Sequence, residues 1–150
     1  MKIAIGSDHG GFHLKEHLRK YLTDKGMQLT DCGTYTSDSC DYPDFAAAVC
    51  AEVTGGKAER GILVCGTGIG ISISANKCHG IRAALCDNVY SAQKSREHND
   101  ANVMCLGERV LGEGLAELIT DTFLTTGFAG GRHQRRVDKI MALEKQQEGK

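Results

Sequence analysis

The chain has 150 residues, of which 41% are hydrophobic and 25% are charged, and its formal net charge is -1. This balance is typical of one soluble globular domain, and the lack of a basic excess argues against nucleic acid or an acidic membrane as a partner. No apolar run approaches the roughly 20 residues of a membrane span, and the run near the N-terminus is too short for a signal peptide.

The sequence contains seven cysteines, and no two of them form a CxxC pair. An odd number without that spacing argues against a disulfide framework and against a thiolate zinc site. We therefore expect a protein of the reducing cytoplasm, in which most of the thiols are small buried hydrophobic groups.

The first part of the chain predicts a strand, a helix and a second strand. Residues 2–6 form the first strand, and residues 27–33 form the second. Between them, residues 13–26 repeat apolar side chains at helical spacing, and Gly26 ends the helix. The apolar face of this helix consists of Leu14, Leu18, Tyr21 and Leu22.

The middle of the chain continues the alternation of strands and helices. Residues 34–43 are a loop rich in Ser, Thr and Asp, and Pro43 suits the first turn of a helix over 44–53. Residues 61–65, "GILVC", have no polar alternation, as expected for a strand covered on both faces. A helix over 69–76 follows this strand.

The last part of the chain predicts two more strands and three more helices, and these complete an α/β pattern. The strands are 80–86 and 101–107, and the helices are 88–99, 112–126 and 131–147. Within 112–126, the residues expected to face inward are Leu115, Leu118, Ile119, Phe123 and Leu124. Five strands alternating with helices predict a three-layer α/β/α sandwich with a parallel, Rossmann-like sheet, in one domain over residues 1–150.

In parallel sheets of this kind, ligands bind beyond the carboxyl ends of the strands, and Asp8 and His9 follow the first strand. An aspartate at this edge can hold sugar hydroxyls, and a histidine can meet a phosphate or move a proton. The simpler alternative is that Asp8 caps a helix. The spacing of His9, His13 and His17 would also suit a metal, but the last two are better explained as a solvated helix face.

Cys65 ends the third strand and is followed by glycines at 66, 68 and 70. Without side chains, these residues let backbone N–H groups approach a ligand, and the helix that follows favours an anion. The segment matches neither a P-loop nor GxGxxG, so it predicts a nest for a small oxyanion. A helix N-terminus also favours the thiolate form, so Cys65 is a candidate nucleophile or base, the alternative being a buried cysteine without a chemical role.

Further polar residues surround the last strand and begin the last helix. Arg132 and Arg136 lie one helical turn apart, so both guanidinium groups can grip a phosphate dianion. The alternative is a solvated, charged helix face. Arg109 follows the fifth strand, and His98 and Asn99 precede it in a polar segment.

These motifs together resemble the ribose-5-phosphate isomerase B family, which also contains galactose-6-phosphate isomerase subunits. The resemblance covers nearly the whole chain, and its specific segments are "GILVCGTGIGISISANK" and "HNDANV". The other matching segments are "SDHGG", "DYPDFA", "GIRAALC", "YSAQKSRE", "LGERV" and "GGRHQRRV". The family implies an isomerase that interconverts ribose 5-phosphate and ribulose 5-phosphate without a metal or nucleotide cofactor.

The resemblance also implies a role for individual residues. Cys65 is the base that moves a proton between C1 and C2, and His98 donates a proton when the sugar ring opens. The backbone of 66–70 stabilises the enediolate, whereas Asp8 and Asn99 hold hydroxyl groups. The implied catalytic residues are Cys65, His98 and Thr67, and the implied substrate-binding residues are Asp8, His9, Gly66, Gly68, Ile69, Gly70, Asn99, Arg109, Arg132 and Arg136.

Family members without this cysteine use a glutamate at the position of Ile71, so Cys65 indicates the thiol branch. The family also implies a homodimer or homotetramer whose active sites combine residues from two subunits. Three alternatives remain open: an isomerase of allose or galactose 6-phosphate, a non-catalytic module that binds sugar phosphates or nucleotides, and a thiol-redox protein. The absence of CxxC argues against the last of these.

Overall fold

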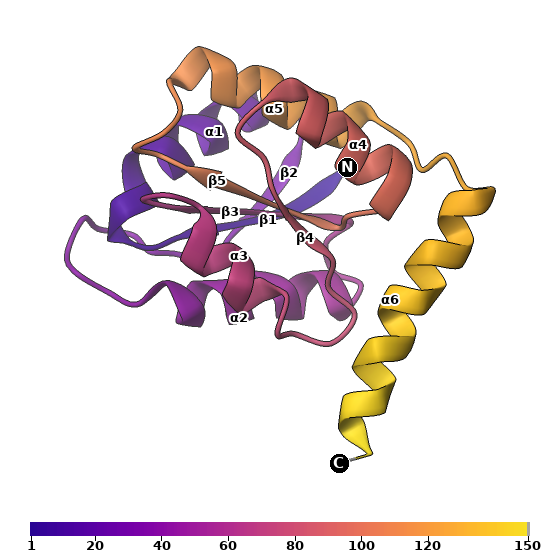
Figure 1. Ribbon diagram of the computed structural model, residues 1–150. Coiled ribbons are helices and arrows are strands. Elements are labelled where there is room, and N and C mark those ends of the chain that lie inside the picture. The colour runs from indigo at the N-terminus through magenta and orange to yellow at the C-terminus, as the bar shows by residue number, and fades with distance from the viewer. Residues whose placement is uncertain (150) are drawn as a thin grey trace.

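The computed structural model describes residues 1–149, in which a five-stranded sheet lies between two layers of helices (Figure 1). This arrangement confirms the predicted α/β/α sandwich with a parallel sheet. The strands are β1 (Lys2–Ser7), β2 (Gln28–Asp31), β3 (Arg60–Cys65), β4 (Ala83–Leu85) and β5 (Val103–Gly107). The helices are α1 (Phe12–Asp24), α2 (Tyr42–Thr54), α3 (Ile69–Ala75), α4 (Val89–Asn99), α5 (Glu113–Thr125) and α6 (Arg132–Glu148).

The order of the strands in the sheet is β2-β1-β3-β5-β4, and every neighbouring pair is parallel. The chain leaves β1 toward one edge of the sheet and leaves β3 toward the other. Their carboxyl ends therefore flank a topological switch point, where ligands bind in open α/β sheets. The register pairs Cys65 with Gly107, so β3 and β5 end side by side at this edge.

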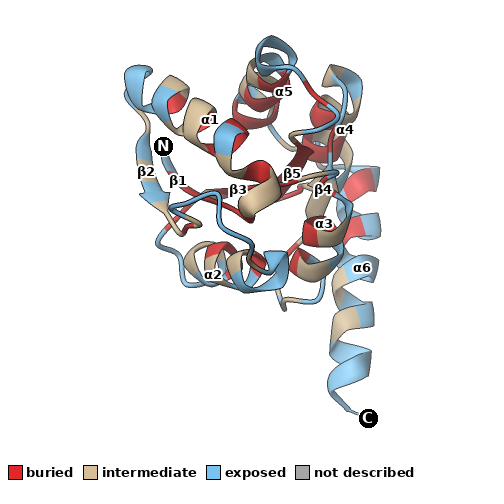
Figure 2. Cartoon of the chain, turned by 90° about the vertical axis from the view of Figure 1, so that its left-hand side faces the viewer, coloured by how far each residue is buried: buried red, intermediate tan, exposed pale blue. Residues whose placement is uncertain are grey.

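The two faces of the sheet carry separate hydrophobic cores, because side chains alternate along each strand. Ile5 of β1, Leu18 of α1 and Phe123 of α5 belong to the core on one face. Leu63 of β3 belongs to the core under α2 and α3 on the other face. The central strands are buried on both sides (Figure 2), which confirms the prediction for the apolar run at 61–65.

The inward face predicted for α5 is partly wrong. Leu115 and Leu118 are 43% and 54% exposed, whereas the buried side chains of this helix include Ala116 and Thr120. The inward stripe repeats at three and four residues from Ala116 through Ile119, and its small or polar members make it inconspicuous in the sequence. The two exposed leucines lie about one turn apart on the solvent side of the helix, outside this stripe.

The fourth strand is shorter than predicted, and the fifth begins two residues later than predicted. At this end of the two segments the side chain of Asn102 adds to the backbone bond from the Asn102 N–H to the Arg82 carbonyl at 3.0 Å. Its amide oxygen accepts from the Arg82 N–H at 2.8 Å, and its amide nitrogen donates to the Gly80 carbonyl at 2.9 Å. These side-chain bonds hold 80–82 beside β5 without a regular ladder.

The longest helix, α6, extends away from the sheet (Figure 1) and buries only His133 and Val137 among its described residues. Its outer turns expose Ile140 and Leu143. Within residues 1–149, no helix combines the length and the apolar character needed to cross a membrane.

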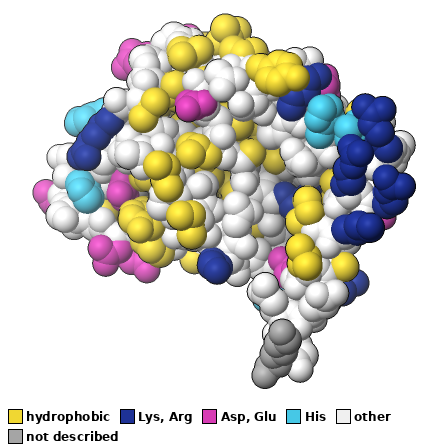
Figure 3. Space-filling model, in the orientation of Figure 1, with side chains coloured by type: hydrophobic (Ala, Val, Ile, Leu, Met, Phe, Trp, Pro, Cys, Tyr) yellow, Lys and Arg dark blue, Asp and Glu magenta, His cyan; other side chains and the backbone are white. Residues whose placement is uncertain are grey.

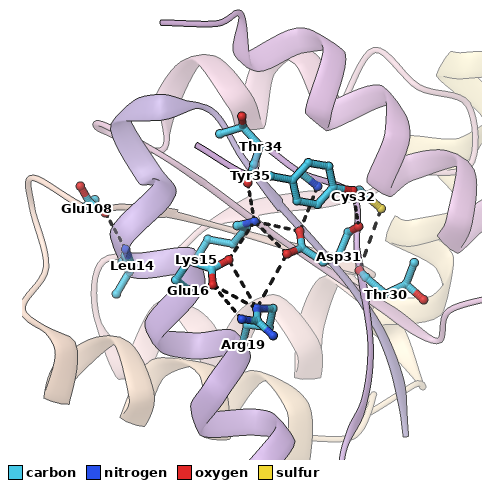
Figure 4. Close-up of polar contacts among 11 residues, drawn as sticks. Leu14, Lys15, Glu16, Arg19, Thr30, Asp31, Cys32, Thr34, Tyr35 and Glu108 are labelled. Carbon is cyan, nitrogen blue, oxygen red and sulfur yellow. Dashed lines mark hydrogen bonds and ion pairs between the residues drawn. The ribbon is translucent and has the colours of Figure 1, made fainter. Parts of the chain in front are cut away.

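A buried lysine joins α1 to the end of β2 (Figure 4). The side chain of Lys15 is 0% exposed, and its ammonium group donates to the Asp31 carboxylate at 2.8 and 3.0 Å and to the Thr34 carbonyl at 2.6 Å. It also lies near the rings of Phe12 and Tyr35. A buried charge needs such partners, so this network fixes the loop that leaves β2.

This network predicts a large stability effect at Lys15. Lys15→Met keeps much of the side-chain volume but leaves the Asp31 carboxylate with only Arg19, at 3.8 Å, so the free energy of unfolding should fall by about 3 kcal/mol. Lys20→Met, which breaks the exposed pair with Asp24, is the matched control and should change stability little. Urea denaturation measures both variants, and equal stabilities would contradict the role given to Lys15.

Candidate active site

The turn after β1 lies directly against the end of β3. The Asp8 carboxylate accepts a hydrogen bond from the Gly11 N–H at 3.1 Å, so the capping role considered for Asp8 does occur, on a short 3-10 turn over His9–Gly11. A Cβ atom on Gly11 would lie 2.5 Å from the Val64 carbonyl group. A residue with a side chain would therefore push the turn away from β3.

His9 is held at this edge by the loop before α2. Its Nδ1 atom lies 3.2 Å from the Cys40 backbone nitrogen, which donates to it. In the tautomer that accepts this bond, Nε2 carries the ring proton and can donate to an anion. The loop over 34–43 therefore supports a predicted site residue, although no residue of that loop was among the predicted site residues.

Cys65 is 4% exposed, and its sulfur accepts a hydrogen bond from the Gly68 N–H at 3.1 Å. The Cys65 and Gly66 carbonyls accept from the backbone N–H groups of Glu108 and Arg109 at 2.9 and 3.0 Å. The cysteine and its loop are thus tied to the end of β5. The hydrogen bond from Gly68 therefore fixes the sulfur at the start of the glycine loop.

Gly68 is required by the shape of this loop. Its φ angle is 79°, and an added Cβ would lie 2.5 Å from the Leu85 side chain and 2.9 Å from the Leu106 carbonyl carbon. This left-handed turn presents the Gly68 N–H to the sulfur and starts α3. The Thr67 hydroxyl, two residues before α3 begins, accepts from the Ile69 N–H at 3.2 Å.

Two further side chains lie on the glycine loop. The Arg109 guanidinium lies 3.4 Å from where a Cβ on Gly66 would stand, as expected for a site residue at the end of β5. Tyr42, at the start of α2, lies so close to Gly70 that a Cβ there would be 2.6 Å from its ring. Tyr42 was not among the predicted site residues. Pro43, in the first turn of α2, did indicate in the sequence that a helix begins here.

The other predicted residues lie at the opposite end of the parallel strands, where β5 begins. His98 and Asn99 end α4, just before β5 begins at Val103, whereas Cys65 pairs with the last residue of β5. At about 3.3 Å per residue, β5 separates these two groups by about 13 Å. Within one chain, the structure therefore does not bring Cys65 and His98 together.

The second group gathers around the start of α6. The ring of His133 stacks on that of His98, with centroids 4.2 Å apart and planes inclined by 10°. Arg132 and Arg136 are exposed on either side of His133 in the sequence, and both lower its pKa by their charge, after burial and His98. Figure 3 shows the basic side chains along α6 beside the histidines.

A groove of about 630 Å³ adjoins the second group, between α6 and the segment that joins α3 to β4. Its lining includes Asn99 together with Ile73, Ile140 and Leu143. The three apolar side chains are largely exposed. Figure 3 shows hydrophobic side chains along α6 and on the facing part of the body.

The remaining thiols and histidines do not form another reactive centre. All seven cysteines are free, and burial raises the pKa of Cys86 to about 11 and that of Cys105 well above its ordinary value. His13 is exposed, and His17 pairs with Glu117 at 2.7 Å. Among residues 1–149, no three His, Cys, Asp or Glu side chains are placed to hold a metal ion together.

The sequence matches a family model described as ribose/galactose isomerase over residues 3–140. It is 51% identical over 143 residues to ribose-5-phosphate isomerase B of Escherichia coli, covering 95% of this chain and 96% of that protein. It is also 44% identical to D-erythrulose-4-phosphate isomerase of Pectobacterium atrosepticum, covering 98% of this chain and 97% of that protein.

Solved structures show the same likeness. Ribose-5-phosphate isomerase B of Clostridium thermocellum has a TM-score of 0.96 and 55% identity, covering 97% of this chain and 99% of that one. The corresponding protein of Thermotoga maritima has a TM-score of 0.93 and 51% identity, covering 94% and 97%. By its sequence and its fold, this chain belongs to the ribose/galactose isomerase family.

Proposed function

We propose that this chain is an aldose–ketose isomerase that interconverts ribose 5-phosphate and ribulose 5-phosphate. The observation that carries the proposal is the Cys65 sulfur, which ends β3 at the switch point and accepts the Gly68 N–H. Relatives with this named activity are 51% and 55% identical to the chain over nearly its whole length.

Cys65 acts as the base of the proton transfer. Its thiolate removes the proton from C2 of the open aldose, and the electron pair of that bond moves toward the carbonyl oxygen to form an enediolate. The C2 hydroxyl passes its proton to O1 while the resulting thiol returns its proton to C1, so the C2 oxygen becomes the carbonyl oxygen of the ketose. Of the backbone N–H groups of residues 66–70, those of Gly68 and Ile69 are occupied within the loop, and the others stabilise the oxyanion. One well-placed donor is worth about 3–4 kcal/mol of barrier.

The substrate is held by two sets of polar groups, one around Cys65 at the carboxyl ends of the strands and one around His98 near the start of β5. His9 and Arg109 bind it at the cysteine edge, with Asp8 and Tyr42 beside the loop. At the other edge, Arg132 and Arg136 hold the phosphate and Asn99 a hydroxyl group, while His98 protonates the ring oxygen. Binding energy from the phosphate positions the carbons that react.

A complete site therefore needs two chains, with the His98 edge of one subunit facing the Cys65 edge of another. Two features of the described residues support this arrangement. β5 separates the two edges by about 13 Å within one chain. In addition, α3 exposes Ile69 and Ile73, and α6 exposes Ile140 and Leu143, which supplies apolar faces for an interface. The assembly is a homodimer or a homotetramer.

The proposal also specifies the number of carbon atoms in the substrate. A relative named for a four-carbon ketose phosphate is 44% identical, so family membership alone does not fix the carbon number. The pentose assignment rests on the higher identity to the ribose-5-phosphate isomerases. Allose or galactose 6-phosphate is the alternative substrate, and a non-catalytic module would have no use for a thiol that receives an amide N–H.

The role of Cys65 predicts loss of turnover when the thiol is removed. Cys65→Ser and Cys65→Ala should lower kcat by roughly 10²- to 10⁴-fold, with little change in KM, because they remove a general base. Cys78→Ser, at a half-buried thiol beyond α3, is the control and should keep wild-type activity. A Cys65→Ala enzyme that turns over ribose 5-phosphate normally would refute the assignment.

The shared site predicts that two inactive variants rescue each other. Cys65→Ser and His98→Asn chains, mixed after unfolding and refolded together, form dimers with one intact site if each site takes Cys65 from one chain and His98 from the other. Random pairing should then restore about one quarter of the wild-type activity. If each site lies within one chain, the mixture will stay as inactive as its components.

The phosphate role predicts a KM effect confined to one face of α6. Arg132→Ala and Arg136→Ala should each raise KM for ribose 5-phosphate about tenfold or more, since each removes a charged hydrogen-bond donor from the phosphate. Arg135→Ala, an exposed arginine of the same helix, serves as the control and should leave KM unchanged. Steady-state kinetics of the three variants test this prediction. An unchanged KM in both Arg132→Ala and Arg136→Ala would contradict the phosphate role.

A further inference from the structure

The first turn of α6 is fixed against the end of α4, where His98 lies. The Ala129 N–H donates to the Glu97 carbonyl at 3.0 Å, and the His133 N–H donates to the Gly130 carbonyl at 3.0 Å. Gly130 has a left-handed backbone with φ of 65°, which turns the chain so that α6 starts beside α4. The backbone of His133 and that of Glu97, the residue before His98, are thus both tied into the junction of α4 and α6.

His133 presents a rigid face to His98. The rings lie 4.2 Å apart and nearly parallel, and His133 is 8% exposed whereas His98 is half-buried. The ring of His133 has no part in the proposed proton transfer or phosphate contacts. It also does not belong to either hydrophobic core described above. Its contact with His98 is therefore a feature of the site that the proposed roles do not yet explain.

The charges around the pair keep His133 neutral. Burial lowers the pKa of His133, and the neighbouring charges of His98, Arg132 and Arg136 act in the same direction. The Glu97 carboxylate opposes them from α4, but it is also paired with Lys94 at 2.5 Å. A neutral His133 places no second positive charge against the stacked His98 ring.

We propose that His133 is a positioning residue for ring opening, in which its stacked ring holds the His98 imidazole in the orientation that donates a proton. This inference rests on the proposed function, because His98 has that role only in the isomerase. In the step itself, the C1–O4 bond of the furanose breaks, and O4 takes the proton from His98 and becomes a hydroxyl group. The C1 hydroxyl releases its proton to solvent and becomes the carbonyl.

Substrate chemistry separates this step from the proton transfer at Cys65. Ribulose 5-phosphate cannot close a furanose ring, because its 5-hydroxyl is esterified, so it reaches Cys65 without ring opening. Deuterium uptake at C1 of ribulose 5-phosphate in heavy water therefore reports the proton transfer alone. Conversion of ribose 5-phosphate reports ring opening and proton transfer together.

The test compares His133→Leu, which removes the flat ring, with His133→Phe, which restores a flat face without a titrating nitrogen. His133→Leu should lower kcat on ribose 5-phosphate about 10- to 100-fold through misplacement of His98, and it should keep deuterium uptake into ribulose 5-phosphate. His133→Phe should recover most of the lost kcat. Val137→Ala, at the next buried residue of α6, controls for loosened packing and should not change the ratio of the two rates.

The outcomes separate a failure of the inference about His133 from a failure of the proposed function. If His133→Leu lowers both rates equally, or if His133→Phe fails to rescue a folded enzyme, then His133 is a packing residue and the inference is wrong. If the unaltered enzyme shows no deuterium uptake into ribulose 5-phosphate, the proposed function itself is wrong, and if Cys65→Ser keeps that uptake, Cys65 is not the base. Size-exclusion chromatography and thermal unfolding of each variant identify a chain that has not folded.

Discussion

The hydrogen bond from the Gly68 amide to the Cys65 sulfur depends on the way three parallel strands end at one edge. β3 delivers the thiol, and β5 holds the loop through the backbone N–H groups of Glu108 and Arg109. The turn after β1 packs on β3 where Gly11 leaves no room for a side chain. The sulfur therefore has a fixed donor before any substrate arrives, and the loop that carries this donor needs no rearrangement during the reaction.

The same parallel sheet separates the site into two halves. Residues that follow β3 and residues that precede β5 lie at opposite edges, and no loop of the described chain bridges them. Under the proposed function, the arginines of α6 and the stacked histidines serve a second copy, which in turn supplies its own Cys65 to them. On this view α6 extends from the body because its role lies in another subunit's site, and its exposed apolar residues belong to the same arrangement.

The sequence predicted the sheet well, because its central strands are apolar on both faces and only a two-layered cover of helices permits that. It also located Cys65 and Asp8 correctly, since parallel strands end at a common edge. The face of α5 was misjudged because its inward stripe contains Thr120 and small residues rather than leucines. Tyr42 was missed because only the folded chain brings the start of α2 against the glycine loop, and the split between Cys65 and His98 became plain only when the strand register was known.

A crystal structure of the Cys65→Ser enzyme with ribose 5-phosphate tests the central claim most directly, because it locates both ends of the sugar at once. The account predicts that C1 and C2 lie beside residue 65 of one subunit while the phosphate contacts Arg132 and Arg136 of a second subunit. A sugar phosphate bound wholly within one chain, or with its reacting carbons away from residue 65, would contradict it.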